Sequence, residues 1–124
     1  MCIRDRPDTG SLAGDVREMV RRSTGVLTTP AARAAMPGLL AEMATDPTLH
    51  EKLLGRFGDI TTRGMTERLD DAASRGEVRG DVTAVDLVEA IAGTALMAII
   101  TRSQDLDDAW VERTATLITK GITA

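Results

Sequence analysis

The sequence predicts an all-α fold, a bundle of helices joined by short connections in a single domain. Hydrophobic residues make up 43% of the 124 residues but aromatic residues only 2%, so the core has to be built from Leu, Ile, Val, Met and Ala. Ala, Leu and Met lose little conformational entropy in a helix. Apolar residues recur at spacings of three and four, and no strand-like alternation occurs. We therefore expect five helices, or six if the chain breaks near Pro37.

Two helices are expected near the start of the chain. Ser11 can cap a helix whose apolar positions include Val16 and Val20. Thr29 followed by Pro30 predicts a second start, because Pro is tolerated at the first helical position, where its missing N–H has no partner. Pro37 lies inside this second segment, so we expect either a kink or a short helix followed by another.

The third predicted helix is long. The pair Asp46-Pro47 repeats the signal of a cap followed by proline, and an apolar stripe then continues to Arg75. Three glycines inside this stripe lower its helix propensity, each by about 1 kcal/mol relative to Ala. Gly76 is expected to end the helix in the left-handed conformation that a Cβ disfavours.

Two apolar helices complete the predicted bundle. We expect Asp81 to start the fourth helix, whose apolar stripe is broad enough to be covered on two sides. Asp105 or Asp107 is expected to cap the fifth helix. Acidic residues at the start of that helix and Lys120 near its end agree with the helix dipole.

Composition argues against several functional classes. The net charge of −4 makes the chain a poor candidate for gripping nucleic acid through its phosphates. The single cysteine, Cys2, excludes an intramolecular disulfide framework. No apolar run reaches the roughly 20 residues that span a bilayer. The N-terminus also lacks the apolar core of a signal peptide, so we expect a cytoplasmic protein with no membrane partner.

The sequence offers little catalytic or metal-binding chemistry. His50 is the only histidine and has no second His or Cys nearby, so a zinc site is not expected. No Gly-rich phosphate loop and no Gly-x-Ser-x-Gly elbow is present. We therefore predict that the protein is not an enzyme and needs neither a metal nor a cofactor.

The first six residues differ from the rest of the chain. The run MCIRDR is the translation expected from a transposon end used to prepare sequencing libraries, ATGTGTATAAGAGACAG, when the codon it opens is completed as Arg. We expect residues 1–6 to be a non-native artefact, which is excluded from fold reasoning. A genuine short tail is the alternative. If residues 1–6 are an artefact, native sequence is expected upstream of Pro7.

Residues 7–15, 73–93 and 106–121 together resemble the C-terminal half of TetR/AcrR-family transcriptional regulators. PDTGSL resembles the junction that leads from the DNA-binding domain into the regulatory domain. AASRGEVRGDVTAVDLVEAIAG resembles the turn and helix before the dimer interface, and LDDAWVERTATLITKG the final interface helix. The chain departs from the family at Gly80, where Pro is frequent, and in its fourth helix, where bulky aromatic residues are common. Both departures bear on the shape expected for the ligand pocket of the regulatory domain.

The resemblance implies that residues 7–124 form a regulatory domain that binds a small hydrophobic effector and forms a homodimer. Operator DNA would be bound only through a helix-turn-helix domain upstream of Pro7. The last two helices would pack against a second copy, with the candidate interface residues Gly93, Met97, Ala98, Trp110, Thr114 and Leu117. A cavity between the first four helices is expected to be lined by Met19, Met43, Phe57, Ile60, Thr61, Ile91, Thr94 and Ala95.

Two other hypotheses stay open. A self-contained helical dimerisation or adaptor module without a ligand also predicts a dimer. An in-frame helix-turn-helix upstream of Pro7 would favour the regulator, and a stop codon there would favour the module. A helical enzyme is the least favoured hypothesis, because it needs a polar cavity holding His50 with a carboxylate partner. The methionines are also explained as ordinary core filler, and Trp110 by packing within its own subunit.

Overall fold

The computed structural model describes residues 9–101 and 106–124, without the side chains of Leu54 and residues 56–65. These described residues confirm the all-α prediction, because they contain helices and a single β-bridge between Val78 and Thr123. The helices follow one another in the order α2 (Leu12–Leu27), α3 (Pro30–Thr45), α4 (Pro47–Ser74), α5 (Ala84–Thr101) and α6 (Asp108–Ile122).

Four of the predicted N-caps are confirmed. In each one a side-chain oxygen accepts a backbone N–H from the first turn of its helix, which satisfies a donor that has no partner inside the helix. The clearest case is α6, where the N–H of Trp110 lies 2.8 Å from the Asp107 carboxylate. The capping residues are Ser11 for α2, Thr29 for α3, Asp46 for α4 and Asp107 for α6.

The predicted start of α5 at Asp81 is wrong, because the helix begins at Ala84. Thr83 and Asp86 form a reciprocal capping box. The Asp86 N–H donates to Thr83 Oγ1 at 3.1 Å, and the Thr83 N–H donates to Asp86 Oδ2 at 3.0 Å. The carboxylate of Asp81 is held instead by Arg79, whose guanidinium hydrogen bonds lower the pKa of Asp81. The box satisfies two backbone donors, the N–H groups of Thr83 and Asp86.

Pro37 does not divide α3, which runs from Pro30 to Thr45 with Pro37 inside it. The alternative of two separate helices is therefore wrong. Proline removes one helical hydrogen bond and crowds the preceding turn, which a helix accommodates by bending. None of the residues described for α3 is buried, so no tight packing opposes such a bend.

Gly76 ends α4 as predicted, with a φ of +74°. The Glu77 N–H donates to the Ala72 carbonyl at 2.9 Å and the Gly76 N–H to the Ala73 carbonyl at 3.0 Å, which is the Schellman arrangement. The loop that follows then pairs with the end of the chain, since the Arg79 N–H donates to the Ile122 carbonyl at 2.9 Å. This pairing fixes the start of α5 next to the end of α6.

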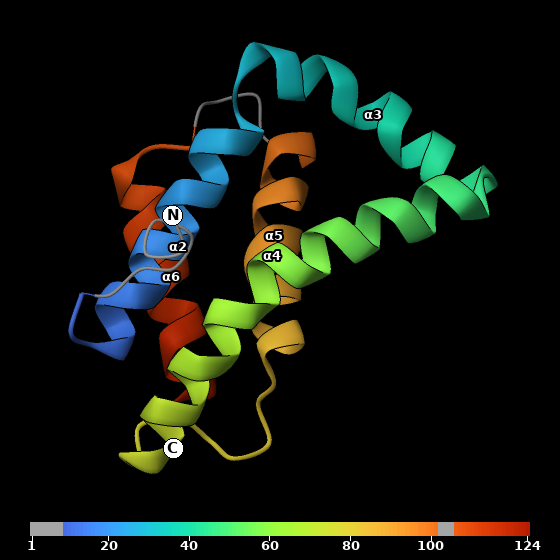
Figure 1. Ribbon diagram of the computed structural model, residues 1–124. Helices are drawn as coiled ribbons and strands as arrows, with labels where there is room; N and C mark the ends of the chain where they lie inside the picture. Colours follow the sequence, from blue (N-terminus) through green and yellow to red (C-terminus); the bar gives the residue numbers. More distant parts are fainter. Residues whose placement is uncertain (1–8, 102–105) are drawn as a thin grey trace.

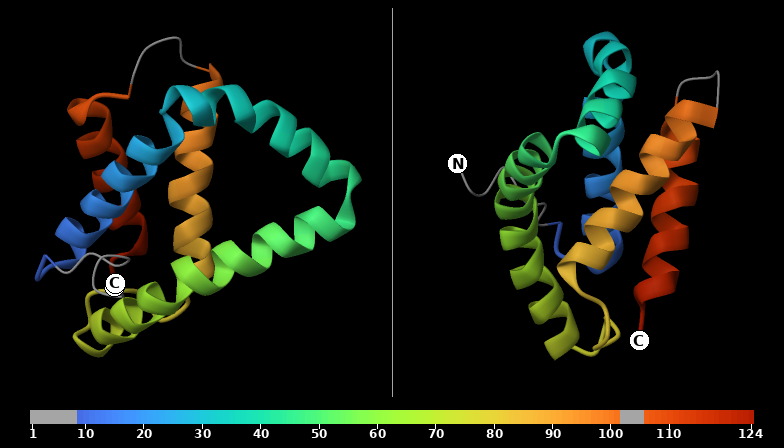
Figure 2. Two further views of the ribbon diagram at one scale, coloured as in Figure 1. Left: turned by 45° about the horizontal axis from the view of Figure 1, so that its top comes forward. Right: turned by 90° about the vertical axis from the view of Figure 1, so that its right-hand side faces the viewer.

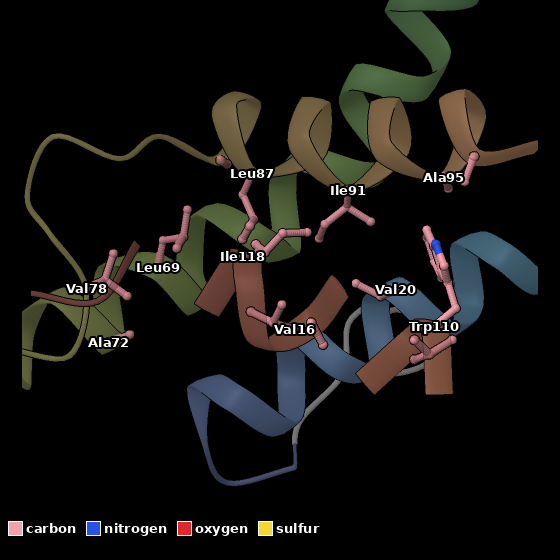
Figure 3. Close-up of a cluster of buried hydrophobic side chains, with 14 residues drawn as sticks. Val16, Val20, Leu69, Ala72, Val78, Leu87, Ile91, Ala95, Trp110 and Ile118 are labelled. Atoms are coloured by element: carbon pink, nitrogen blue, oxygen red, sulfur yellow. The ribbon is translucent and has the colours of Figure 1, made fainter. Parts of the chain in front are cut away.

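The hydrophobic core lies where α2, α5, α6 and the C-terminal end of α4 meet, and we call these elements the body (Figures 1 and 3). The largest fully buried side chains are Leu87 of α5 and Val16 and Val20 of α2. Residues 30–53, comprising α3 and the first turns of α4, project away from the body, as the left view in Figure 2 shows. We call this segment the arm; no residue in it is buried, and every one is described.

Candidate functional site

The six predicted interface residues lie together on one surface of the body. They line a groove of about 650 Å³ between α5 and α6, which also includes Glu89 and Arg113 at its rim. The floor of this α5–α6 groove is buried, with Trp110 only 5% exposed and Ala98 and Thr114 also covered. Met97 and Leu117 stand beside it, 59% and 72% exposed. The groove is therefore an open surface rather than an enclosed pocket, in which apolar side chains lie beside Glu89, Arg113 and three threonines.

Two exposed large apolar side chains, those of Met97 and Leu117, line this groove. The large apolar residues that the structure describes as exposed on α5 and α6 are Val85, Met97, Ile100 and Leu117. Met97 and Leu117 thus bring exposed apolar side chains from two helices to one groove, which is typical of an interaction site. Among the described residues, α5 is also the one helix long and apolar enough to cross a membrane, with a mean hydropathy of 1.8. That is weak evidence, because the core helix of a water-soluble protein passes the same test.

The residues expected to line an effector cavity are distributed over several environments. Ile91 and Ala95 are buried in the core, where Ile91 points toward Val20 of α2 (Figure 3). Met19 packs against the same core and is half-buried. Met43 is half-buried on the arm. Thr94 lies in the α5–α6 groove, and its hydroxyl donates to the Ala90 carbonyl. The side chains of Phe57, Ile60 and Thr61 lie outside the described residues.

A second groove, which sequence reasoning missed, lies between the end of α2, the arm and the C-terminal half of α5. Its volume is about 500 Å³, and it is more enclosed than the α5–α6 groove. One signal for it is present in the sequence, because its α3 residues follow one another at spacings of three, one and three along a helix face. The residues lining this α2–α3–α5 groove are Leu27, Arg33, Met36, Pro37, Leu40, Leu96, Ile99 and Ile100.

The start of α2 carries a buried polar cluster that sequence reasoning also missed. Asp15 is 8% exposed, and its Oδ1 accepts the Thr9 N–H at 2.7 Å and the Thr9 hydroxyl at 2.9 Å. Its Oδ2 lies 3.7 Å from Nε of Arg68 on α4. A Cβ on Gly14 would lie 2.2 Å from Thr9 Oγ1, so only glycine allows this approach. The cluster joins the loop before α2 to two helices of the body.

The described residues offer no arrangement suited to holding a metal. No group of three His, Cys, Asp or Glu side chains is found among them. His50 is exposed near the start of α4. The polar chemistry that the described side chains provide is therefore that of caps, ion pairs and the Asp15 cluster.

The family model for the tetracyclin repressor-like, C-terminal domain matches residues 6–118. A comparison with curated proteins found no match, and neither did a comparison with solved structures. The matched range runs from the loop before α2 into α6 and so contains both grooves and the core between them. The chain belongs to the TetR family of regulators, as a C-terminal domain of the tetracyclin repressor-like type.

Proposed function

We propose that the chain is the effector-binding and dimerisation domain of a cytoplasmic TetR-family transcriptional repressor, acting as a homodimer. Operator DNA is bound by a helix-turn-helix domain encoded upstream of Pro7, and not by residues 7–124. The observation that carries the proposal is the α5–α6 groove, which all six predicted interface residues line together, with Met97 and Leu117 exposed beside a buried floor that includes Trp110.

The chemistry of this surface suits a second copy of the same chain. In a two-fold dimer a residue on one subunit meets a different residue on the other, so a surface has to complement itself. The α5–α6 groove carries Glu89 on α5 and Arg113 on α6, which are opposite charges on adjacent helices. Met97 and Leu117 supply protruding apolar side chains, and Trp110 supplies an apolar floor. Aromatic residues at the centre of such surfaces carry a large share of binding energy.

Regulation requires that the effector bind two arrangements of the dimer unequally, because a ligand with equal affinity for both shifts nothing. The effector cavity is proposed between α2, α3, α4 and α5, where Met43 comes from the arm and the α4 segment carries Phe57, Ile60 and Thr61. Movement of the arm relative to the body would then change the separation of the two DNA-reading domains.

Sedimentation equilibrium of three proteins tests the proposed interface. The wild-type chain is expected to be a dimer, and Leu117→Arg a monomer with unchanged helix content, because two guanidinium groups would be forced into an apolar contact. Val26→Arg is the matched control, since Val26 is 67% exposed on α2 and lines neither groove. A monomeric wild-type chain, or a dimeric Leu117→Arg variant, would contradict the interface.

A dimer is also expected of a stand-alone adaptor module, so a second observation separates the two hypotheses. The genomic sequence upstream of Pro7 is expected to encode a helix-turn-helix in the same reading frame. A gel-shift assay of residues 7–124 is expected to show no operator binding. An in-frame stop codon upstream would favour the adaptor module instead.

A further inference from the structure

Glu89 of α5 and Arg113 of α6 are opposite charges that line the α5–α6 groove without meeting each other. Both side chains are exposed. Among the ion pairs and side-chain hydrogen bonds of the described residues, none involves either of them. By contrast, the exposed arginines Arg75 and Arg79 each pair with a carboxylate close by in the sequence. Glu89 and Arg113 are therefore available to a partner outside the subunit.

The two charges lie at different levels along the groove. Helices α5 and α6 run in opposite directions, as Figures 1 and 2 show. The hydrogen bond from the Arg79 N–H to the Ile122 carbonyl places the start of α5 beside the end of α6. Glu89 is the first α5 residue that lines the groove and Leu117 is the last from α6, so both mark the end nearest the start of α5. Arg113 precedes Leu117 by about one helical turn, so it lies roughly 6 Å further along the groove.

A two-fold dimer can bring these charges together across the interface. In such a dimer each contact occurs twice, between the same two residues with the subunits exchanged. A two-fold axis that crosses the groove at right angles to the helices, between the levels of Glu89 and Arg113, exchanges those levels and lays α5 of one subunit over α6 of the other. Glu89 then meets Arg113 of the partner subunit, once on each side of the axis. A two-fold axis parallel to the helices leaves each charge at its own level and makes neither pair.

We propose that two ion pairs hold the dimer in register, each joining Glu89 of one subunit to Arg113 of the partner subunit, and that these pairs make the groove select a second copy of this chain. This inference deepens the proposed function and rests on it. Met97, Trp110 and Leu117 supply the apolar area of the contact. Exposed charges at its rim contribute little affinity and mainly decide which partner and which orientation fit. A helical partner with an acidic residue opposite Glu89, or a basic one opposite Arg113, is disfavoured because like charges repel.

Exchange of the two charges, followed by sedimentation equilibrium, tests the proposal. Glu89→Arg places like charges in both contacts of its homodimer, and so does Arg113→Glu. Each variant is expected to self-associate at least about tenfold more weakly than the wild-type chain. In the heterodimer of the two variants, every contact again joins opposite charges. An equimolar mixture is therefore expected to recover wild-type dimerisation at a concentration at which each variant alone is largely monomeric, and native mass spectrometry identifies the heterodimer.

Two further proteins serve as controls. Glu89→Arg combined with Arg113→Glu in one chain restores opposite charges in every contact, so it is expected to dimerise like the wild-type chain. Glu42→Arg makes the same change of charge as Glu89→Arg on the arm, where Glu42 is exposed and lines neither groove, and is expected to leave dimerisation unchanged. Circular dichroism is expected to show the same helix content in all of these variants, because each substitution is made at an exposed position.

Two results would overturn the proposal: self-association of the single variants equal to that of the wild-type chain, or a mixture that stays monomeric. The second result would count against it even if the combined variant dimerised, because the two charges would then act within one subunit. Failure of the proposed function looks different, since the wild-type chain would be monomeric or Leu117→Arg would stay dimeric. If Leu117→Arg is monomeric while the charge variants dimerise like the wild-type chain, the interface stands and only the ion pairs are refuted.

Discussion

The body and the arm are built from similar helices that are held in place differently. Helices α2 and α3 have 16 residues each, yet α2 buries five of them while α3, described throughout, buries none. Helix α2 is covered by α5 and α6, whose buried faces meet it in the core. Helix α3 is held by its Thr29 cap, by the intrinsic helix propensity of its alanines and by contacts along one side. The comparison teaches that the body is ordered by its own packing, whereas the arm is held mainly by local helix signals.

The largest expected difference between the two regions is the cost of removing one leucine. Leu87 in the body is 2% exposed and Leu40 on the arm is 38% exposed. Leu87→Ala is expected to lower the free energy of unfolding by about 2–5 kcal/mol, because it leaves a cavity in a packed core. Leu40→Ala is expected to cost less than about 1 kcal/mol. Urea denaturation at one fixed protein concentration measures both, and equal losses would break the comparison.

A smaller difference is expected within α2, between its packed start and its open end. Gly14 lies against Thr9, whereas a Cβ on Gly25 would meet no described atom within 4 Å. Gly25→Ala is therefore expected to raise the free energy of unfolding by up to about 1 kcal/mol. Gly14→Ala has to displace Thr9 and break its hydrogen bonds to Asp15, so a net loss of about 1 kcal/mol is expected. Thermal unfolding measures both, and shifts of the same sign would contradict this account of the Asp15 cluster.

The smallest expected effect is a difference in acid sensitivity between the starts of α5 and α3. Asp86 accepts the Thr83 N–H, and this bond, followed by the bond with the Thr83 side chain, lowers the pKa of Asp86 below its ordinary value of 3.8. At pH values above 3.8 the ionised carboxylate of Asp86 thus stabilises the start of α5. This contribution is lost as the pH falls through the lowered pKa of Asp86. The Thr29 cap of α3 does not titrate.

An NMR titration of the Thr83 amide shift measures this effect. We expect a midpoint below the ordinary aspartate value and no such step in Asp86→Asn, whose side-chain amide does not ionise. A midpoint at or above the ordinary value would show that the capping box does not hold the carboxylate.

Local signals made the helices predictable, and competition between neighbours explains the exception. The caps at Ser11, Thr29 and Asp46 depend on residues within one turn, so the sequence contains all the information they need. The start of α5 depended on whether Asp81 or Thr83 would act as the cap. In the structure Arg79 holds the Asp81 carboxylate and Thr83 caps the helix, and residue types alone do not reveal that choice.

The candidate sites also divide into those that local spacing predicts and those that depend on how the helices pack together. Gly93, Met97, Trp110 and Leu117 follow helical spacing on α5 and α6, so their common surface could be anticipated once those helices were taken as neighbours. The broad apolar stripe of α5 does not say which side faces the body, which is why Ile91 was expected in a cavity but lies in the core. The spacing of Arg33, Met36 and Leu40 marks one face of α3, but the α2–α3–α5 groove also depends on how the arm sits over α5, which no local pattern encodes.

Hydrogen exchange of the wild-type chain tests the contrast between body and arm most directly. Amides of the body open through global unfolding, whereas amides of a segment without buried residues open locally at a much lower free-energy cost. We predict that α3 amides exchange at least about a hundredfold faster than those in the middle of α5, after correction for intrinsic rates. Protection in α3 equal to that in α5 would contradict the account, because it would show that the arm is held by the same cooperative packing as the body.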